Sequence, residues 1–341
     1  MSSIHKQIAG SATSAKRIAT LGILTVFIAV NVWAQGPQKV PDVTAMSVED
    51  LMNMQVTSVS KRTQKLADAA AAIFVLTQED IRRSGATSIP EALRLVPGLE
   101  VARIDENKWA IGSRGFNGRF DNKLLVLIDG RSVYTPLFSG VYWNIQDVML
   151  EDIDRIEVIR GPGATLWGAN AVDGVINIIT KPAAATQSAI VTAGGGTDER
   201  GSGGVRYGGK IGDDTHYRIY GKYFDWGPSN YVTGGTANDG WNAMRGGFRA
   251  DWTPGGANSL TLQGDIYRSK YDETLTIPSL SSPFSSTFPN TGIYSGGNIL
   301  GRWNHKSEGG SMSVQMYYDN TTTVDNSLFV DHQNIFDIDF Q

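Results

Sequence analysis

The chain has 341 residues, a formal net charge of −4 and no cysteine. The lack of cysteine excludes a disulfide scaffold, a thiolate zinc site, an iron–sulfur cluster and a cysteine nucleophile. The charge gives no basic surface field, so a nucleic-acid partner is not expected. The four histidines are too scattered for a metal triad or a histidine-dependent enzyme, and they are His5, His216, His305 and His332.

The composition changes near residue 185. Residues 1–185 contain 14 of the 39 glycines, and residues 186–341 contain the other 25. Average usage of about 7% would give roughly 24 glycines in the whole chain. Aromatic residues are concentrated in the second part as well. The chain is therefore expected to join two domains of different construction.

The N-terminus is typical of an export signal. Lys16 and Arg17 precede an apolar run over residues 18–33, and small residues lie where a signal peptidase cleaves. The alternative is a retained transmembrane helix, but such a helix needs roughly 20 apolar residues and this run is shorter. We expect a signal peptide over residues 1–34, cleaved after Ala34, followed by a periplasmic leader over residues 35–54.

Residues 55–182 predict a small α/β domain. Thr77 with Asp80 predicts a helix start, Gly85 predicts its end, and Ser88 with Glu91 predicts a second start. Asp129 is expected to cap a turn. Apolar runs predict strands over residues 73–76, 124–128, 153–159 and 175–179.

After Lys181, apolar residues recur at every second position, as in a strand with one apolar face. Val205, Tyr207 and Ile211 share one face of a predicted strand, whereas Arg206 and Lys210 share the other. About eight such strands are expected between residues 188 and 340. Connections alternate between short turns and long loops: turns at 212–215, 254–258 and 306–310, and loops at 227–246 and 269–297.

Two architectures produce strands with this alternation. A soluble β-sandwich is one. Aromatic residues on the apolar face, a charged opposite face and alternating connection lengths favour an outer-membrane barrel instead. A closed barrel of eight strands is filled by its own side chains. A domain of roughly 128 residues therefore does not fit inside it. We therefore expect residues 183–341 to form an incomplete barrel, about eight antiparallel transmembrane strands of a larger one, in a chain that is itself a fragment.

Three segments carry a family resemblance. They are IGSRGF at residues 111–116, VLIDG at 126–130 and IEVIRGPGATLWGANAVDGVINIITK at 156–181. Together they resemble the plug domain of the TonB-dependent outer-membrane receptors. Trp167 departs from the family, which often has Tyr there. The resemblance implies an α/β plug over residues 55–182 inside an outer-membrane barrel.

The resemblance also implies a partner, the periplasmic C-terminal domain of TonB. An uncharged, extended segment suits capture by β-augmentation, in which main-chain hydrogen bonds provide the affinity. The alternative is that this segment is simply the first strand of the plug. The TonB-box candidate consists of Gln55, Val56, Thr57, Ser58, Val59 and Ser60.

The resemblance also suggests residues that anchor the plug and residues that contact the ligand. Arg114, Glu157 and Arg160 are candidates for plug–barrel anchoring, with ion pairs inside the plug as the alternative. Aromatic and arginine side chains can contact a bulky planar or anionic complex, although they can equally pack against the barrel wall. The ligand-contact candidates are Arg114, Phe116, Arg119, Tyr134, Phe138, Tyr142 and Trp143.

The expected function is TonB-energised uptake of a bulky, scarce small-molecule ligand across the outer membrane of a Gram-negative bacterium. A ferric siderophore is the first substrate class and cobalamin the second. The alternatives are an uncoupled outer-membrane channel, a surface-binding receptor, or a truncated fragment that is inactive by itself. We expect no enzymatic activity, contact with outer-membrane lipid, no metal site and no resident cofactor, although the substrate itself can be a metal chelate.

Overall fold

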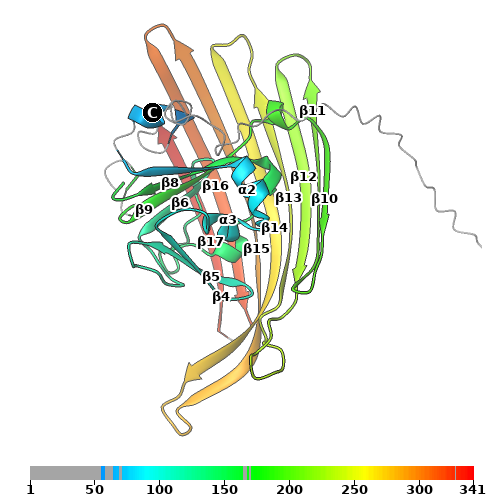
Figure 1. Cartoon of the computed structure of the whole chain (residues 1–341). Helices are drawn as coiled ribbons and strands as arrows, with labels where there is room; N and C mark the ends of the chain where they lie inside the picture. The colour runs from blue at the N-terminus through cyan, green and yellow to red at the C-terminus, as the bar shows by residue number, and fades with distance from the viewer. Residues whose placement is uncertain (1–54, 58–63, 69–70, 164–166, 169, 327) are drawn as a thin grey trace, which may run out of the picture. The chain divides into compact units, whose positions relative to one another are not determined.

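The computed structural model describes residues 55–57, 64–68, 71–163, 167–168, 170–326 and 328–341 (Figure 1). The expected signal peptide, the leader over residues 35–54 and the last three residues of the TonB-box candidate lie outside these ranges. None of the helices described is long and apolar enough to cross a membrane.

A mixed five-stranded sheet forms the centre of the plug domain. Its order is β3 (Ile73–Thr77), β8 (Ile153–Arg160), β9 (Gly174–Thr180), β6 (Leu124–Ile128) and β7 (Arg131–Ser132). Strands β6 and β9 pair in parallel, and the other neighbours are antiparallel. All five residues of β6 are buried, as the uninterrupted apolar run predicts. The strands expected from the four apolar runs are confirmed.

The two predicted helices also form. Helix α2 (Gln78–Ser84) begins with a reciprocal capping box between Thr77 and Asp80, and Gly85 ends it in a left-handed conformation with a φ of 72°. Helix α3 (Ile89–Leu93) begins at Ser88, whose side chain accepts a hydrogen bond from the Glu91 backbone N–H.

Smaller elements complete the plug. The hairpin of β4 (Leu99–Asp105) and β5 (Lys108–Ser113) stands apart from the central sheet and was not predicted. The short strands β1 (Gln55–Val56) and β2 (Gln64–Lys65) pair with each other. The described part of the plug also contains the short 3-10 helices η1 (Leu66–Asp68), η2 (Trp143–Ile145) and η3 (Leu150–Asp152), and η4 (Ala183–Thr186) follows it.

Eight strands after the plug form a second sheet, here called the wall, in which every neighbouring pair is antiparallel and consecutive in the chain. This confirms the strand number and pairing expected from the sequence. The strands are β10 (Ser188–Gly194), β11 (Glu199–Ile211), β12 (Thr215–Trp226), β13 (Trp241–Trp252), β14 (Asn258–Pro278), β15 (Ser285–Ser307), β16 (Gly310–Asp325) and β17 (Phe329–Phe340).

The apolar face of the wall points outward. Val205 is 56% exposed and Ile219 is 54% exposed, whereas the neighbouring Arg206 and Arg218 are 7% and 5% exposed. A soluble sandwich would bury the apolar side chains and expose the charged ones. The sandwich alternative is therefore wrong, and this inverted arrangement is that of a lipid-facing barrel wall.

One predicted loop is wrong. Most of residues 269–297 belongs to β14 and β15, which continue as a long two-stranded ribbon and turn only at residues 279–284 (Figure 1). Polar residues face each other across this ribbon, for example Thr276 and Thr287, whose hydroxyls are 2.9 Å apart. One face of the ribbon carries Leu275, Ile277 and Phe288. This apolar stretch is short, and the Ser, Thr, Pro and Asn residues around it indicated a loop. The other predicted loop is shorter than expected, because β13 begins at Trp241.

Acid should destabilise helix α2 through Glu79. Hydrogen bonds from Arg82 and Arg83 lower the pKa of Glu79 from 4.5 to about 2. A lowered folded-state pKa contributes stability that is complete above pH 4.5 and is lost as the pH falls through about 2. The protection factors of the α2 amides against hydrogen exchange, which remove the intrinsic pH dependence of the exchange reaction, should therefore fall over this window. In Glu79→Gln the fall should be smaller, and an unchanged fall would contradict the assignment.

Candidate functional site

The last plug strand is bound at its end by the carboxylate of Asp129. Its oxygens accept hydrogen bonds from the Thr180 backbone N–H at 2.8 Å and from the Thr180 hydroxyl at 2.7 Å. A third bond comes from the wall, where the Gln263 amide donates at 2.9 Å. Asp129 was expected to cap a turn. It instead joins the ends of β6 and β9 and contacts the wall, because the two strands are parallel neighbours and end side by side.

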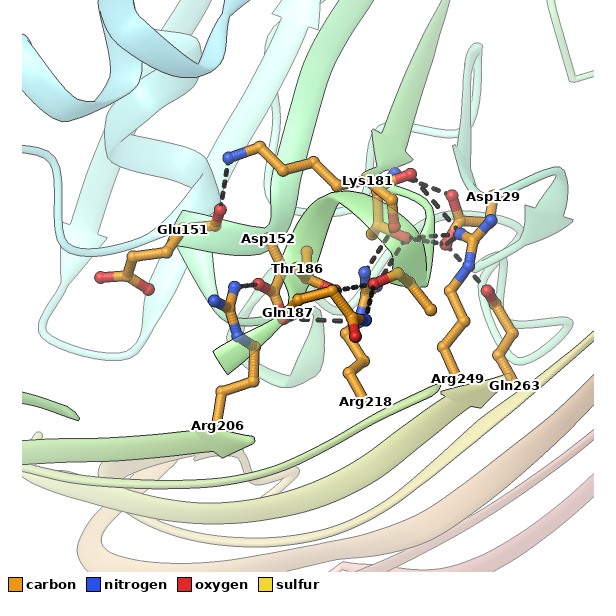
Figure 2. A network of polar contacts seen from close by, with 12 residues as sticks. Asp129, Glu151, Asp152, Lys181, Thr186, Gln187, Arg206, Arg218, Arg249 and Gln263 are labelled. Atoms are coloured by element: carbon orange, nitrogen blue, oxygen red, sulfur yellow. Dashed lines mark hydrogen bonds and ion pairs between the residues drawn. The ribbon is translucent and has the colours of Figure 1, made fainter. Parts of the chain in front are cut away.

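Two wall arginines converge on a second plug carboxylate, that of Asp152 in η3 (Figure 2). Arg206 of β11 donates to one carboxylate oxygen, and Arg218 of β12 lies 3.4 Å from the other. The side chains of all three are at most 7% exposed. Charges this deeply buried require partners, since an unpaired buried ion costs several kcal/mol. The plug supplies the anion that the wall arginines need.

The segment that leads from plug to wall is fixed in the same way. Arg218 donates to the Thr180 hydroxyl at 3.0 Å and to the Lys181 carbonyl, and Arg249 of β13 donates to the same hydroxyl at 3.1 Å. Asp251 accepts a bond of 2.6 Å from the Ala183 backbone N–H. Lys181 donates to the Glu151 carbonyl at 2.8 Å, and burial lowers its pKa. We call the contacts described so far between the plug and the wall the polar junction. On the plug side they involve Asp129, Asp152 and residues 180–183.

A different set of contacts joins the β4–β5 hairpin to the wall. Asn107, 1% exposed, donates to the backbone carbonyls of Asp239 at 2.8 Å and Asp272 at 2.9 Å. Asp239 lies in the connection before β13, and Asp272 lies on β14. The side chain of Lys108 reaches Glu273 at 3.2 Å. The hairpin tip is thus clamped between a connecting loop and a wall strand.

Aromatic rings continue from the plug to the wall next to this hairpin. Ring centroids are separated by 4.9 Å for Phe120–Phe138, 4.8 Å for Phe138–Tyr142, 5.1 Å for Tyr142–Tyr294 and 4.9 Å for Tyr294–Tyr271. We call these five residues the aromatic ladder. Burial raises the pKa of Tyr142, so its hydroxyl is protonated at neutral pH.

The ligand-contact candidates do not form one surface. Phe138 and Tyr142 belong to the ladder, and the guanidinium of Arg119 lies 5.0 Å from the Phe120 ring centre. Trp143 is buried in the core and only 7% exposed. The others lie in nearby plug loops: Arg114 and Phe116 are exposed, and Tyr134 is half-buried.

The anchoring candidates contact the plug. Glu157 accepts a bond of 2.8 Å from Arg155 and one of 3.0 Å from the Thr57 backbone N–H, and Arg160 donates to the Pro97 carbonyl at 3.0 Å. Arg114 lies beside Gly161, again in the plug. These described contacts lie within the plug, as the alternative of ion pairs inside the domain expects, and plug–wall anchoring by these three residues stays a prediction. The described plug carboxylates that contact the wall are those of Asp152 and Asp129.

The first half of the TonB-box candidate lies on the plug. Gln55 and Val56 pair with Lys65 and Gln64, and Val56 is fully buried. The bond from Thr57 to Glu157 fixes the segment to β8. This pairing does not decide between the TonB-box and the first-strand interpretations.

Sequence reasoning missed Asp152, Asn107, Tyr271 and Tyr294. Asp152 pairs with an arginine 54 positions further along the chain, and Asn107 with a carbonyl 132 positions away. The sequence did show that arginines recur on the inner face of the wall. Such arginines need hydrogen-bond acceptors, but the sequence does not show which plug residues provide them.

An α/β plug bound through buried polar contacts to an inverted antiparallel wall defines the class of plugged outer-membrane barrel proteins. Residues 65–175 match the TonB-dependent Receptor Plug Domain family. The plug of this chain therefore belongs to the TonB-dependent receptor family, as its motifs indicate.

Similar proteins agree with this assignment. A vitamin B12 transporter of Photobacterium profundum is 30% identical over 270 residues, which cover 74% of this chain and 42% of that protein. A vitamin B12 transporter of Vibrio vulnificus is 33% identical over 145 residues, which cover 42% of this chain and 23% of that protein. The chain spans less than half the length of these relatives.

Solved structures share the fold. The ferripyoverdine receptor of the outer membrane of Pseudomonas aeruginosa aligns with a TM-score of 0.63 at 15% identity, over 80% of this chain and 37% of that one. The siderophore receptor PirA from Acinetobacter baumannii aligns with a TM-score of 0.56 at 20% identity, over 79% of this chain and 44% of that one.

Removing the Asp152 carboxylate should loosen the plug. In Asp152→Ala, Arg206 and Arg218 lose their buried anion, which should cost about 3–5 kcal/mol in the free energy of plug unfolding. The matched control is Asp154→Ala, whose side chain is 41% exposed and pairs with Arg155; it should cost less than about 1 kcal/mol. Denaturant unfolding followed by hydrogen exchange in β9 measures both, and equal effects would contradict the assignment.

Proposed function

We propose that this protein is an outer-membrane receptor that imports a bulky, scarce nutrient with energy delivered by TonB. The observation that carries the proposal is the polar junction, through which a separate plug domain is bound to the wall by hydrogen bonds and ion pairs. Polar contacts can be exchanged for contacts with water at modest net cost. A plug bound in this way can be displaced, as a gated importer requires and a permanently open channel does not.

The energised partner is proposed to be the periplasmic C-terminal domain of TonB, acting on residues 55–60. The relevant support comes from its described residues, 55–57, which are held by a two-residue strand pair, one buried valine and the contact of Thr57 with Glu157. Once released, an extended strand offers its main chain for β-augmentation. The proposed location is the outer membrane, reached through the signal peptide at residues 1–34, and the exposed apolar face of the wall suits lipid.

Cobalamin is the substrate that we now place first, ahead of a ferric siderophore. The sequence relatives at 30% and 33% identity are vitamin B12 transporters, whereas the siderophore receptors share the fold at 20% identity or less. The aromatic ladder offers rings for a large planar ligand. The alternative function is an uncoupled channel or a surface receptor that binds without importing.

A proline in the TonB-box candidate should abolish TonB-energised uptake and leave ligand binding at the surface intact. Val56→Pro removes a backbone N–H from the segment and should reduce cobalamin uptake to the level of a strain that lacks the protein, while surface binding of cobalamin is retained. Gln64→Pro is the control, because it disturbs the partner strand β2 outside the candidate box. Normal uptake by the Val56 variant would favour the uncoupled alternative.

Shortening the aromatic ladder should weaken ligand binding. Phe138→Ala removes the central ring between Phe120 and Tyr142, and the affinity for cyanocobalamin should fall about tenfold, or about 1.4 kcal/mol. Phe336→Ala is the control, because its side chain is 65% exposed on the outer face of the wall. Equilibrium binding to the purified protein measures both variants. Equal affinities would remove the ladder from the proposed ligand site.

A further inference from the structure

The outer face of the wall contains a groove of about 580 Å³ that crosses strands β11–β14. Its floor includes Gly221 of β12 and Gly246 of β13, which are paired directly opposite each other. A Cβ added at Gly221 would meet no neighbouring atom within 4 Å, so this position opens into free space. Glycine weakens the interior of a strand and often marks a place that a ligand approaches closely. Two adjacent glycines on one face therefore indicate a surface that another molecule covers.

Apolar side chains border the two glycines on all sides. They lie in the neighbouring strands or two residues away in the same strand, and each is between 38% and 73% exposed. Adjacent strands are about 4.8 Å apart, so two glycines side by side leave a slot for one extended hydrocarbon chain. The bordering residues are Val205, Ile219, Tyr223, Met244, Phe248 and Ile266.

One end of the groove carries a cation. Arg268 of β14 lines the groove and lies two residues beyond Ile266 on the same face. It is exposed and makes no hydrogen bond or ion pair with the described part of the chain. Lys270, the next residue on this face, already lies 3.8 Å from Asp272. Arg268 is therefore the charge that is available to an anionic group at the groove.

The outward-facing residues of β14 change character at Arg268. Before it they include Leu260, Leu262 and Ile266, and after it they are Lys270, Asp272 and Thr274. The long connections, residues 227–240 and the β14–β15 ribbon, lie on the side of Arg268, whereas the turns at 212–214, 253–257 and 308–309 lie at the other end. In outer-membrane barrels the apolar band ends where the lipid headgroups begin, and the longer connections are external. Arg268 therefore lies at the level of the external headgroups, and the groove runs from it into the apolar band.

This arrangement selects a lipid by its headgroup. Lipid tails are as apolar as the wall, so a tail gains nothing from the hydrophobic effect when it moves from the bilayer to the groove. Close packing over the bare backbone of the glycines and contact with Arg268 are the remaining sources of preference. Arginine binds phosphate oxygens with two parallel hydrogen bonds, and a basic residue near a membrane surface favours anionic lipid.

We propose that this groove binds one membrane lipid that carries a phosphate on its headgroup. The phosphate contacts Arg268, and one acyl chain packs over Gly221 and Gly246 between Val205 and Ile266. The inference rests on the outer-membrane location that is part of the proposed function. It requires neither the transported nutrient nor TonB.

The test uses dimyristoyl phosphatidic acid as the probe. Dimyristoylglycerol has the same chains without the phosphate, and glycerol 3-phosphate has the phosphate without the chains. Native mass spectrometry of the purified, delipidated chain in non-ionic detergent measures the affinity for the first molecule bound. Phosphatidic acid should bind about fivefold more tightly than dimyristoylglycerol, as expected for one basic residue at a membrane surface. Glycerol 3-phosphate should not bind.

Two pairs of variants locate the site. Gly221→Leu fills the slot and should weaken phosphatidic acid about tenfold. Its control is Gly301→Leu on the outer face of β15, where an added Cβ meets only Met316 at 3.9 Å, and this variant should bind normally. Arg268→Gln should weaken phosphatidic acid about fivefold and leave dimyristoylglycerol unchanged. Its control is Lys306→Gln, an exposed residue at the opposite end of the wall, which should have no effect.

Near-ultraviolet circular dichroism verifies that each variant is folded. The proposal is overturned if dimyristoylglycerol binds as tightly as phosphatidic acid, if glycerol 3-phosphate binds, or if the folded Gly221 and Arg268 variants bind normally. Cyanocobalamin binding is measured on the same preparations. Cobalamin binding without phosphatidic acid binding overturns the lipid site alone, whereas the reverse result supports the lipid site and contradicts the proposed substrate.

Discussion

The association of plug and wall depends on partners for the arginines of the inner wall face, which the plug covers. Arg206, Arg218 and Arg245 are each 9% exposed or less. Guanidinium groups in such surroundings need anions or carbonyls, and the plug provides them through Asp152, Lys181 and Ile145. The reverse also holds, because the Asp152 carboxylate, 2% exposed in this interface, is paired with Arg206 and Arg218 of the wall. Each domain therefore supplies partners for the charges that the other brings into the interface.

The plug meets the wall through two physically different interfaces. At the end of β9 the contacts are ion pairs and hydrogen bonds with fixed geometry, and water can replace them singly. Near the β4–β5 hairpin the plug core continues into the wall, since Trp109 and Trp143 form one buried cluster with Phe224 and Trp241. Separation there would expose apolar area that cannot be compensated by water. Displacement of the plug should therefore begin at the polar junction.

Local features were predictable from the sequence, and long-range ones were not. The capping box of α2 and the apolar strand β6 depend on neighbours within a few residues. The alternation of Val205 and Arg206 showed which face of the wall is apolar, and the inverted exposure followed. The partner of Arg206 did not follow, because several acidic plug residues were equally plausible. The ribbon of β14 and β15 was missed because its apolar stretch of Leu275, Ile277 and Phe288 is short and lies among Ser, Thr, Pro and Asn residues, which indicate a loop.

The two sheets differ in how far apart along the chain their paired strands lie. In the wall every strand pairs with the next one, and β14 meets β15 across a turn of six residues, 279–284. In the plug, β3 pairs with β8, and β6 pairs in parallel with β9 although β7 and β8 lie between them in the chain. Loop-closure entropy makes distant pairings slow to form, whereas adjacent hairpins can close one after another. The wall can therefore assemble progressively from each turn, but the plug sheet can be completed only after the chain as far as Thr180 is available.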